Sequence, residues 1–242
     1  MSLQSKRVVI IGGTSGIGFA VARAALDEGA DVVVASSQAA NADAAAMALG
    51  PGSIAGDVVD VRDEASVEAF FGRAGPFDHL VFTAGDWGGR GARPLGETDL
   101  EQAKDLAAVR YWGAVAAIKH ATKTISTHGS ITLTNGMIAH RPRKGTPLST
   151  AMAGSIEHLV RGLAVDLAPI RVNAVCPGLI HTGVWDSIPE ADRQTQFERL
   201  TARQPIARIG EPEEAAEAYL YLMRGGYTTG QVLLVDGGSS VV

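Results

Sequence analysis

Short apolar runs recur along the whole chain, and stretches of mixed polarity separate them. Within those stretches apolar residues return at three- and four-residue steps, as Leu159, Leu163 and Leu167 do, which is typical of a helix with one buried face. Near-continuous apolar strands that alternate with helices predict a parallel sheet covered by helices on both faces. The predicted strands are Val8–Ile11, Asp31–Ala35, Ser53–Val59, His79–Thr83, Ser130–Thr134, Ile170–Val175 and Gln231–Val235.

The alternation predicts an α/β fold, a single-domain Rossmann fold with a doubly wound parallel sheet of about seven strands. We expect one domain over residues 1–242, because no internal repeat interrupts the pattern. The Ala-rich stretch 39–50 is interpreted as a helix rather than a linker, since good helix formers fill it. Two loops, 86–99 and 136–149, follow predicted strands. Ligands of such folds bind at the carboxyl ends of strands, so we expect both loops to border a substrate site; ordinary surface loops are the alternative.

Composition narrows the classes of function. A chain of 242 residues, 46% of them hydrophobic, is long enough for one substantial core, and its net charge of −5 argues against a nucleic-acid partner. The apolar run near the N-terminus is a strand rather than a signal peptide, and no window has the roughly 18 apolar residues of a membrane span. The histidines are scattered, so we expect no metal site. Cys176 is the only cysteine, which excludes an intrachain disulfide and favours a cytoplasmic location.

A glycine-rich turn lies between the first predicted strand and the first predicted helix, in VVIIGGTSGIGFAVARAAL. Glycine lets the backbone approach a pyrophosphate closely, and the N-terminus of the helix directs free N–H groups toward it. The turn therefore predicts a dinucleotide site; a turn that serves only helix–strand packing is the alternative. The expected contacts are Gly12, Thr14, Ser15, Gly16, Ile17 and Gly18.

The end of the second predicted strand bears on the choice of cofactor. NAD-binding folds usually place an acidic residue there to hold the adenosine ribose, whereas this chain has Ser36, Ser37 and Gln38. No carboxylate would repel a 2′-phosphate, and no Arg or Lys would attract one. We interpret Ser36 and Ser37 as cofactor-binding residues and favour NADP(H) over NAD(H).

Five segments, in order, resemble the motifs of the classical short-chain dehydrogenase/reductase family. They are GGTSGIG, DVRDEASV, FTAG, RVNAVCPGLIHT and TTGQVLLVDGG, and together they span essentially the whole chain. The resemblance implies an NAD(P)-dependent oxidoreductase in which Asp60 bonds the adenine amine and Val61 packs on the adenine ring. It also implies that the Pro-Gly segment lies along the nicotinamide. The remaining cofactor contacts implied by the resemblance are Ala84, Gly85, Pro177, Gly178, Ile180 and Thr182.

The chain departs from this family at the four positions of the Asn-Ser-Tyr-Lys tetrad. Ser149 stands in place of the Tyr that exchanges a proton, and Ala153 in place of the Lys that lowers the pKa of that Tyr. Gly136 replaces the Ser that binds the substrate oxygen, and Arg110 replaces the Asn of the water relay. No tyrosine occurs between residues 111 and 219, so no small shift of the alignment restores one.

These departures leave two hypotheses of different classes. The first is an NAD(P)H-dependent reductase that transfers hydride to an activated carbonyl or similar small molecule without the Tyr/Lys proton donor. The loss of positioned proton transfer typically costs 10²–10⁴-fold, which a reactive substrate tolerates. The second is a catalytically silent NADP(H)-binding sensor or scaffold protein. We favour the enzyme, because the nicotinamide segment is retained. Cofactor-free lyase chemistry, as in halohydrin dehalogenases, fits less well, since those proteins keep Ser and Tyr and lose the nucleotide loop.

Two residues are candidates for the missing proton donor. His140 falls in the loop that lines the pocket in this family, and histidine titrates near neutrality. The alternative for His140 is a solvated loop histidine beside Arg141 and Arg143. Ser149 is a candidate to hold a water or a substrate oxygen; the alternative is an N-cap of the following helix.

Arg110 brings a permanent charge to the former relay position. We weigh two roles for it, binding of an acidic substrate and an ion pair with Asp105 or Asp86. Asp86 and Trp87 are further candidates for the wall of the nicotinamide pocket, and loop packing is the alternative for Trp87.

The partners expected are a small-molecule substrate and further copies of the chain. The apolar faces of the helices that follow Ala103 and Ser149, with the C-terminal segment, resemble the surfaces by which family members form dimers and tetramers. We predict a homotetramer, with a homodimer as the alternative.

Overall fold

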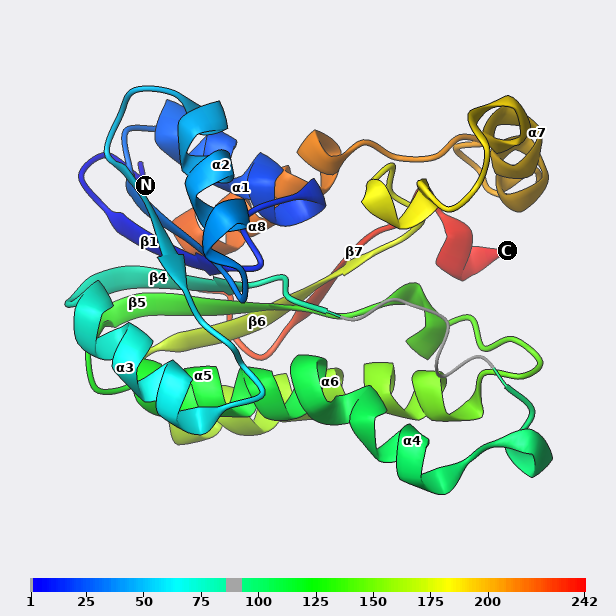
Figure 1. Cartoon of the computed structure of the whole chain (residues 1–242), viewed down its shortest axis with the longest axis horizontal. Coiled ribbons are helices and arrows are strands. Elements are labelled where there is room, and N and C mark those ends of the chain that lie inside the picture. The colour runs from blue at the N-terminus through cyan, green and yellow to red at the C-terminus, as the bar shows by residue number, and fades with distance from the viewer. Residues whose placement is uncertain (1, 86–92) are drawn as a thin grey trace.

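The sheet of the protein has seven strands, all parallel (Figure 1). The computed structural model describes residues 2–85 and 93–242. The strand order is β3-β2-β1-β4-β5-β6-β7, so every apolar run predicted as a strand is one. The strands are β1 (Arg7–Ile11), β2 (Asp31–Ser36), β3 (Ile54–Val58), β4 (Phe77–Phe82), β5 (Ile125–Thr134), β6 (Arg171–Pro177) and β7 (Val232–Val235).

Helices cover both faces of the sheet, as the alternating pattern predicts, and each face has its own apolar core (Figure 1). On one face lie α1 (Gly16–Asp27), α2 (Ala39–Leu49) and α8 (Pro212–Arg224), and on the other lie α3 (Glu64–Ala74), α5 (Ala114–Ala121) and α6 (Pro147–Asp166). The short α4 (Leu100–Lys104) precedes a π-helical segment, η3 (Ala108–Gly113), and α7 (Glu190–Thr201) lies beyond β6. The predicted single-domain, doubly wound Rossmann fold is therefore confirmed.

The chain reverses its direction of progress along the sheet at β1, the central strand. From β1 the chain continues to β2 and β3 on one side, then returns to β4 on the other side of β1. Open α/β sheets bind ligands in the crevice beyond the carboxyl ends of the strands at such a switch point. The glycine-rich turn after β1 and residues Thr83–Gly85 after β4 both lie at that crevice.

Helix α6 begins earlier than the sequence indicates. Its N-cap is Thr146, and Pro147 occupies the first turn, where its missing N–H costs no hydrogen bond. Ser149 therefore lies inside the first turn, so the interpretation of Ser149 as an N-cap is wrong. The loop between β5 and α6 is correspondingly shorter than the predicted 136–149, and it contains the single-turn helix η4 (Met137–Ala139). The Ala-rich stretch forms α2 as predicted and ends at Gly50, whose φ of 87° suits glycine.

Among the helices formed by residues 2–85 and 93–242, none is both long enough and apolar enough to cross a membrane. Those same residues contain no group of three or more His, Cys, Asp or Glu side chains arranged to hold a metal ion.

Candidate cofactor and substrate site

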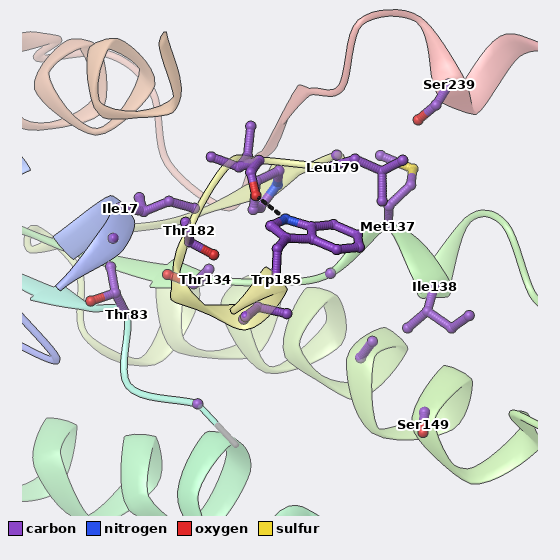
Figure 2. Close-up of a pocket in the computed structure, with 18 of the residues that line it drawn as sticks. Ile17, Thr83, Thr134, Met137, Ile138, Ser149, Leu179, Thr182, Trp185 and Ser239 are labelled. Carbon is purple, nitrogen blue, oxygen red and sulfur yellow. Dashed lines mark hydrogen bonds between the residues drawn. The ribbon is translucent and has the colours of Figure 1, made fainter. Parts of the chain in front are cut away.

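A cavity of about 1030 Å³ opens at the carboxyl ends of β1, β4, β5 and β6 (Figure 2). One end is walled by the glycine-rich turn and the start of α1. The other end is walled by η4, the start of α6, the single-turn helix η5 (Gly183–Trp185) and α7. The cavity therefore joins the predicted dinucleotide site to the region where the sequence predicts a substrate.

Close backbone packing shapes the cofactor end. Gly12 has a φ of 88°, and a Cβ placed on it would lie 2.5 Å from the backbone nitrogen of Ala84. A Cβ on Gly18 would overlap the carbonyl oxygen of Gly12. These contacts hold the turn after β1 against the segment after β4. The packing considered as the alternative for these glycines is therefore present; the same residues also line the cavity, and their cofactor role stays a prediction.

The N-terminus of α1 faces the segment that follows β6. Ser15 is the N-cap, and its hydroxyl makes no capping hydrogen bond within the described structure. A Cβ on Gly16 would lie 3.0 Å from Cγ2 of Thr182, so the two predicted pyrophosphate contacts come from opposite sides of one site. Free N–H groups at a helix N-terminus attract anions. This end of the cavity is therefore suited to a pyrophosphate.

The structure brings together most of the residues predicted to bind the cofactor. Twelve of them line the single cavity described above: Gly12, Thr14, Ser15, Gly16, Ile17, Gly18, Ala84, Gly85, Pro177, Gly178, Ile180 and Thr182.

The other four predicted contacts lie beyond the wall of that cavity, near the ends of β2 and β3. The Ser36 carbonyl accepts a hydrogen bond of 2.9 Å from the Val59 N–H, so the two strand ends are neighbours. Ser37 follows Ser36 and is exposed. The Asp60 carboxylate accepts from the Arg62 N–H at 3.0 Å, and Val61 is 8% exposed and packs against Gly113. Their roles toward an adenosine stay predictions.

The four positions that the sequence resemblance matches to the family tetrad meet at the cavity. Ser149 and Ala153 lie one turn apart on α6, Gly136 ends the segment after β5, and Arg110 reaches the cavity from η3. Arg110 is 4% exposed, and its guanidinium lies against Gly85, where a Cβ would overlap it. Asp86 and Trp87, the other residues proposed for this wall, lie outside the described residues.

His140 contacts α6 rather than the cavity lumen. Its Nε2 lies 2.7 Å from Oε1 of Glu157, and the same oxygen accepts a 2.7 Å hydrogen bond from Nδ2 of the buried Asn135. The cavity wall is formed instead by its neighbours Met137, Ile138 and Arg141. Sequence reasoning missed Glu157, although its position one helical turn beyond Ala153 was a signal for a residue on a nearby face of α6.

Apolar side chains form the substrate end. Trp185 donates a 2.7 Å hydrogen bond from Nε1 to the Ile180 carbonyl, which holds its indole across the cavity (Figure 2). Its ring also packs edge-on against Phe197 of α7, with centroids 5.3 Å apart. Trp185 was not predicted from the sequence, because its importance depends on α7 folding over the segment after β6.

Two ionisable groups beside the cavity are held neutral. Burial raises the pKa of the Cys176 thiol to about 12, and the nearby carboxylates of Glu157 and Asp236 act in the same direction. Burial also raises the pKa of Tyr219, whose hydroxyl lies 2.7 Å from Oγ1 of Thr134. A protonated, buried thiol is a poor nucleophile, so we assign Cys176 no chemical role.

Comparison with known proteins agrees with this geometry. A family model described as enoyl-(acyl carrier protein) reductase matches residues 12–240. Over 257 residues the chain is 35% identical to short-chain dehydrogenase/reductase ucsE of an Acremonium species, covering 99% of this chain and 97% of the relative. The chain belongs to the short-chain dehydrogenase/reductase family, and it is an oxidoreductase of that type.

Two solved structures are similar over nearly their whole length. A small-chain dehydrogenase in complex with NADPH is 35% identical, with a TM-score of 0.84 and coverage of 99% of this chain and 100% of that one. An NADPH-bound short-chain oxidoreductase from Pseudomonas aeruginosa PAO1, described as containing an atypical catalytic center, is 28% identical, with a TM-score of 0.89 and coverage of 98% and 97%.

Proposed function

We propose that this protein is an NADP(H)-dependent reductase that acts on an activated carbonyl or a similar small molecule without the Tyr/Lys proton donor. One observation carries the proposal: the cavity that contains the predicted cofactor contacts continues into an apolar chamber beside Ser149 and Ala153. Neither residue supplies an acid near neutral pH, because a serine hydroxyl without an adjacent base is a poor proton donor and alanine has none.

The residues present fit a dinucleotide. The glycines of the turn line the cavity without side chains, and the α1 N-terminus offers N–H groups to phosphate oxygens. When bound, the cofactor supplies a hydride. Pro177 and Gly178 border the place expected for its nicotinamide, and Trp185 and Met137 line the same cavity. NADPH in two similar structures supports NADP(H) as the cofactor.

Such a site suits a substrate that needs little acid assistance. Orienting the reacting atoms alone supplies about 7–11 kcal/mol of the barrier reduction, whereas lost proton transfer costs roughly 10²–10⁴-fold. Activated ketones, iminium ions and conjugated alkenes meet that condition. A proton for the product comes from water or from His140, the sequence neighbour of the cavity-wall residue Arg141.

The test has two stages. We expect NADPH to bind with a Kd below about 1 mM and more tightly than NADH, measured by fluorescence or calorimetry. We then expect NADPH oxidation with at least one member of a panel of activated ketones, diketones, imines and enones. Failure to bind either cofactor would refute the proposal. Tight binding with no turnover across the panel would favour the silent sensor or scaffold.

The role of His140 is tested separately once a substrate is found. We expect His140→Ala to lower kcat at least about tenfold, whereas His158→Ala, an exposed histidine of α6, should leave kcat unchanged. An unchanged rate in both variants would remove His140 from the mechanism.

We also propose that the protein assembles as a homotetramer, or failing that a homodimer. Trp112 of η3 is 62% exposed and Val165 of α6 is 82% exposed, and both lie on the helices where the sequence predicts an interface. Size-exclusion chromatography with light scattering should give the mass of four or two chains; a monomer contradicts this part.

A further inference from the structure

Arginines surround the substrate end of the cavity. Arg141 and Arg143 follow η4, Arg199 lies on α7, and Arg203 lies just beyond that helix. All four are exposed and border the cavity from two segments that are far apart in the sequence. A fifth arginine, Arg110, borders the cavity at a buried position.

No acidic side chain balances this charge among the described residues that line the cavity. Several other arginines of this acidic chain have carboxylate partners, as Arg73 has in Asp57 at 2.8 Å and Arg208 has in Glu214 at 2.6 Å. Within residues 2–85 and 93–242 the side chains of Arg141, Arg143, Arg199 and Arg203 form no ion pair. The chain has a net charge of −5, so the concentration of positive charge here does not reflect composition.

The two segments that bear these arginines are held in place. Arg141 donates its N–H to the Met137 carbonyl at 2.8 Å, and the adjoining His140 contacts Glu157 of α6. The Thr146 hydroxyl donates to the Arg143 carbonyl at 2.7 Å, which fixes the turn before α6.

On the other side, α7 is fastened through Phe197. Its ring packs against Trp185 and also against His181, with centroids 5.3 Å and 5.8 Å apart. Arg199 lies two residues farther along the same helix. Anchored segments lose little backbone freedom when a ligand binds, which favours affinity.

Apolar surface separates the arginines from the expected nicotinamide position. Met137, Ile138, Leu179, Val184, Trp185 and Leu200 line this part of the cavity. A ligand that fits has an apolar body against these side chains and a polar group at its outer end. Guanidinium groups bind carboxylate and phosphate oxygens through paired, charge-assisted hydrogen bonds.

We propose that the four arginines form an anion subsite that binds a carboxylate or phosphate group of the substrate, with the apolar body of the substrate against Trp185. This inference rests on the proposed function, because it names the substrate class of that site. The subsite lies across the cavity from the glycine-rich turn, so it is separate from the expected pyrophosphate position.

The test compares ligands that differ mainly in charge. Calorimetry on the NADPH-saturated full chain measures the Kd of 4-phenylbutyrate, its neutral amide and 3-phenylpropyl phosphate. We expect at least one anion to bind about fivefold or more tightly than the amide, and its affinity to fall with added salt. Preference for the carboxylate or for the phosphate identifies which group the substrate bears.

Two double variants locate the effect. One variant combines Arg199→Gln with Arg203→Gln, and the other combines Arg141→Gln with Arg143→Gln. Each should raise the Kd of the anion about five- to thirty-fold and change the Kd of the amide less than about twofold. The matched control is Lys119→Gln with Lys123→Gln, which removes two exposed charges that pair with Glu64 and Glu68 near the opposite end of the sheet. The control should leave every Kd unchanged.

Each of three results with the probes overturns the inference: equal affinity for the anions and the amide, no binding of any probe, or an equal loss in the control. If the arginine variants instead weaken NADPH binding about tenfold, the arginines serve the cofactor and the subsite is refuted. Failure of the proposed function has a different signature, namely no cofactor binding or no turnover. The ratio of anion to amide affinity can be measured on the protein without cofactor in that case.

Discussion

A buried histidine should make the stability of the sheet depend on pH. His79 of β4 is 5% exposed, and its Nδ1 lies 2.8 Å from Oγ of Ser130 on the neighbouring β5. Burial lowers the pKa of His79 from 6.5 to about 4. As the pH falls from 6.5 to 4, the unfolded chain gains a proton that the folded chain does not, so the free energy of unfolding falls.

The size of this loss in the free energy of unfolding depends on the interval between the pKa of His79 in the unfolded chain and its pKa in the folded chain. At about 1.4 kcal/mol for each pH unit, the loss from pH 7 to below pH 4 is about 3 kcal/mol. That is a large part of the roughly 5–15 kcal/mol by which folded domains are usually stable.

Urea unfolding at fixed protein concentration, from pH 7.5 to pH 4, measures this contribution. His79→Gln keeps a side chain that can bond Ser130 but cannot titrate. We expect its free energy of unfolding to be lower than that of the unsubstituted protein at pH 7, and to fall by about 3 kcal/mol less between pH 7 and pH 4. His128→Gln changes an exposed histidine of β5 and should follow the unsubstituted protein. If His79→Gln and the unsubstituted protein show parallel curves, the reasoning from burial is wrong.

Three further substitutions test the site and its support. Gly18→Ala places a methyl group against the Gly12 carbonyl and should weaken NADPH binding at least about tenfold and lower the Tm; unchanged titrations would show that the turn tolerates a side chain. Tyr219→Phe removes a hydroxyl that contacts buried Thr134, and urea unfolding should give a loss of about 1–2 kcal/mol; a neutral result would mean the contact contributes nothing. Ser37→Asp should shift the ratio of NADH to NADPH affinity about tenfold or more toward NADH, and an unchanged ratio would place the 2′-phosphate elsewhere.

The strands could be predicted because a buried parallel sheet requires near-continuous apolar runs, which short-range sequence displays. The boundary of β5 could not. It begins at Ile125 rather than at the predicted Ser130, because Phe77 of β4 pairs with Ile125, and the register then shifts past the polar stretch 126–129 before His79 pairs with Ser130. Likewise Ser149 could be read as an N-cap from residue type alone, whereas Pro147 starts α6 two residues earlier.

The gathering of the predicted cofactor contacts at one end of the cavity could also be predicted, since its glycines and the Pro-Gly segment are contiguous motifs. The substrate end was not, because its parts are side chains from distant segments. His140 contacts Glu157 only because the segment around η4 packs against α6. Arg199 and Arg141 line the same cavity only because α7 lies beside it. Residue spacing along the chain does not predict such contacts between distant segments.

The two ends of the cavity differ in how readily their residues can be substituted during evolution. At the cofactor end, main-chain atoms approach each other so closely that Gly12 and Gly18 cannot acquire a side chain without displacing a strand connection. At the substrate end, Ser149, Ala153 and Arg199 meet the cavity through side chains on helices whose backbones are satisfied independently. We therefore expect selection or laboratory evolution to exchange the side chains at the substrate end one by one, while the backbone geometry of the glycine-rich end is kept.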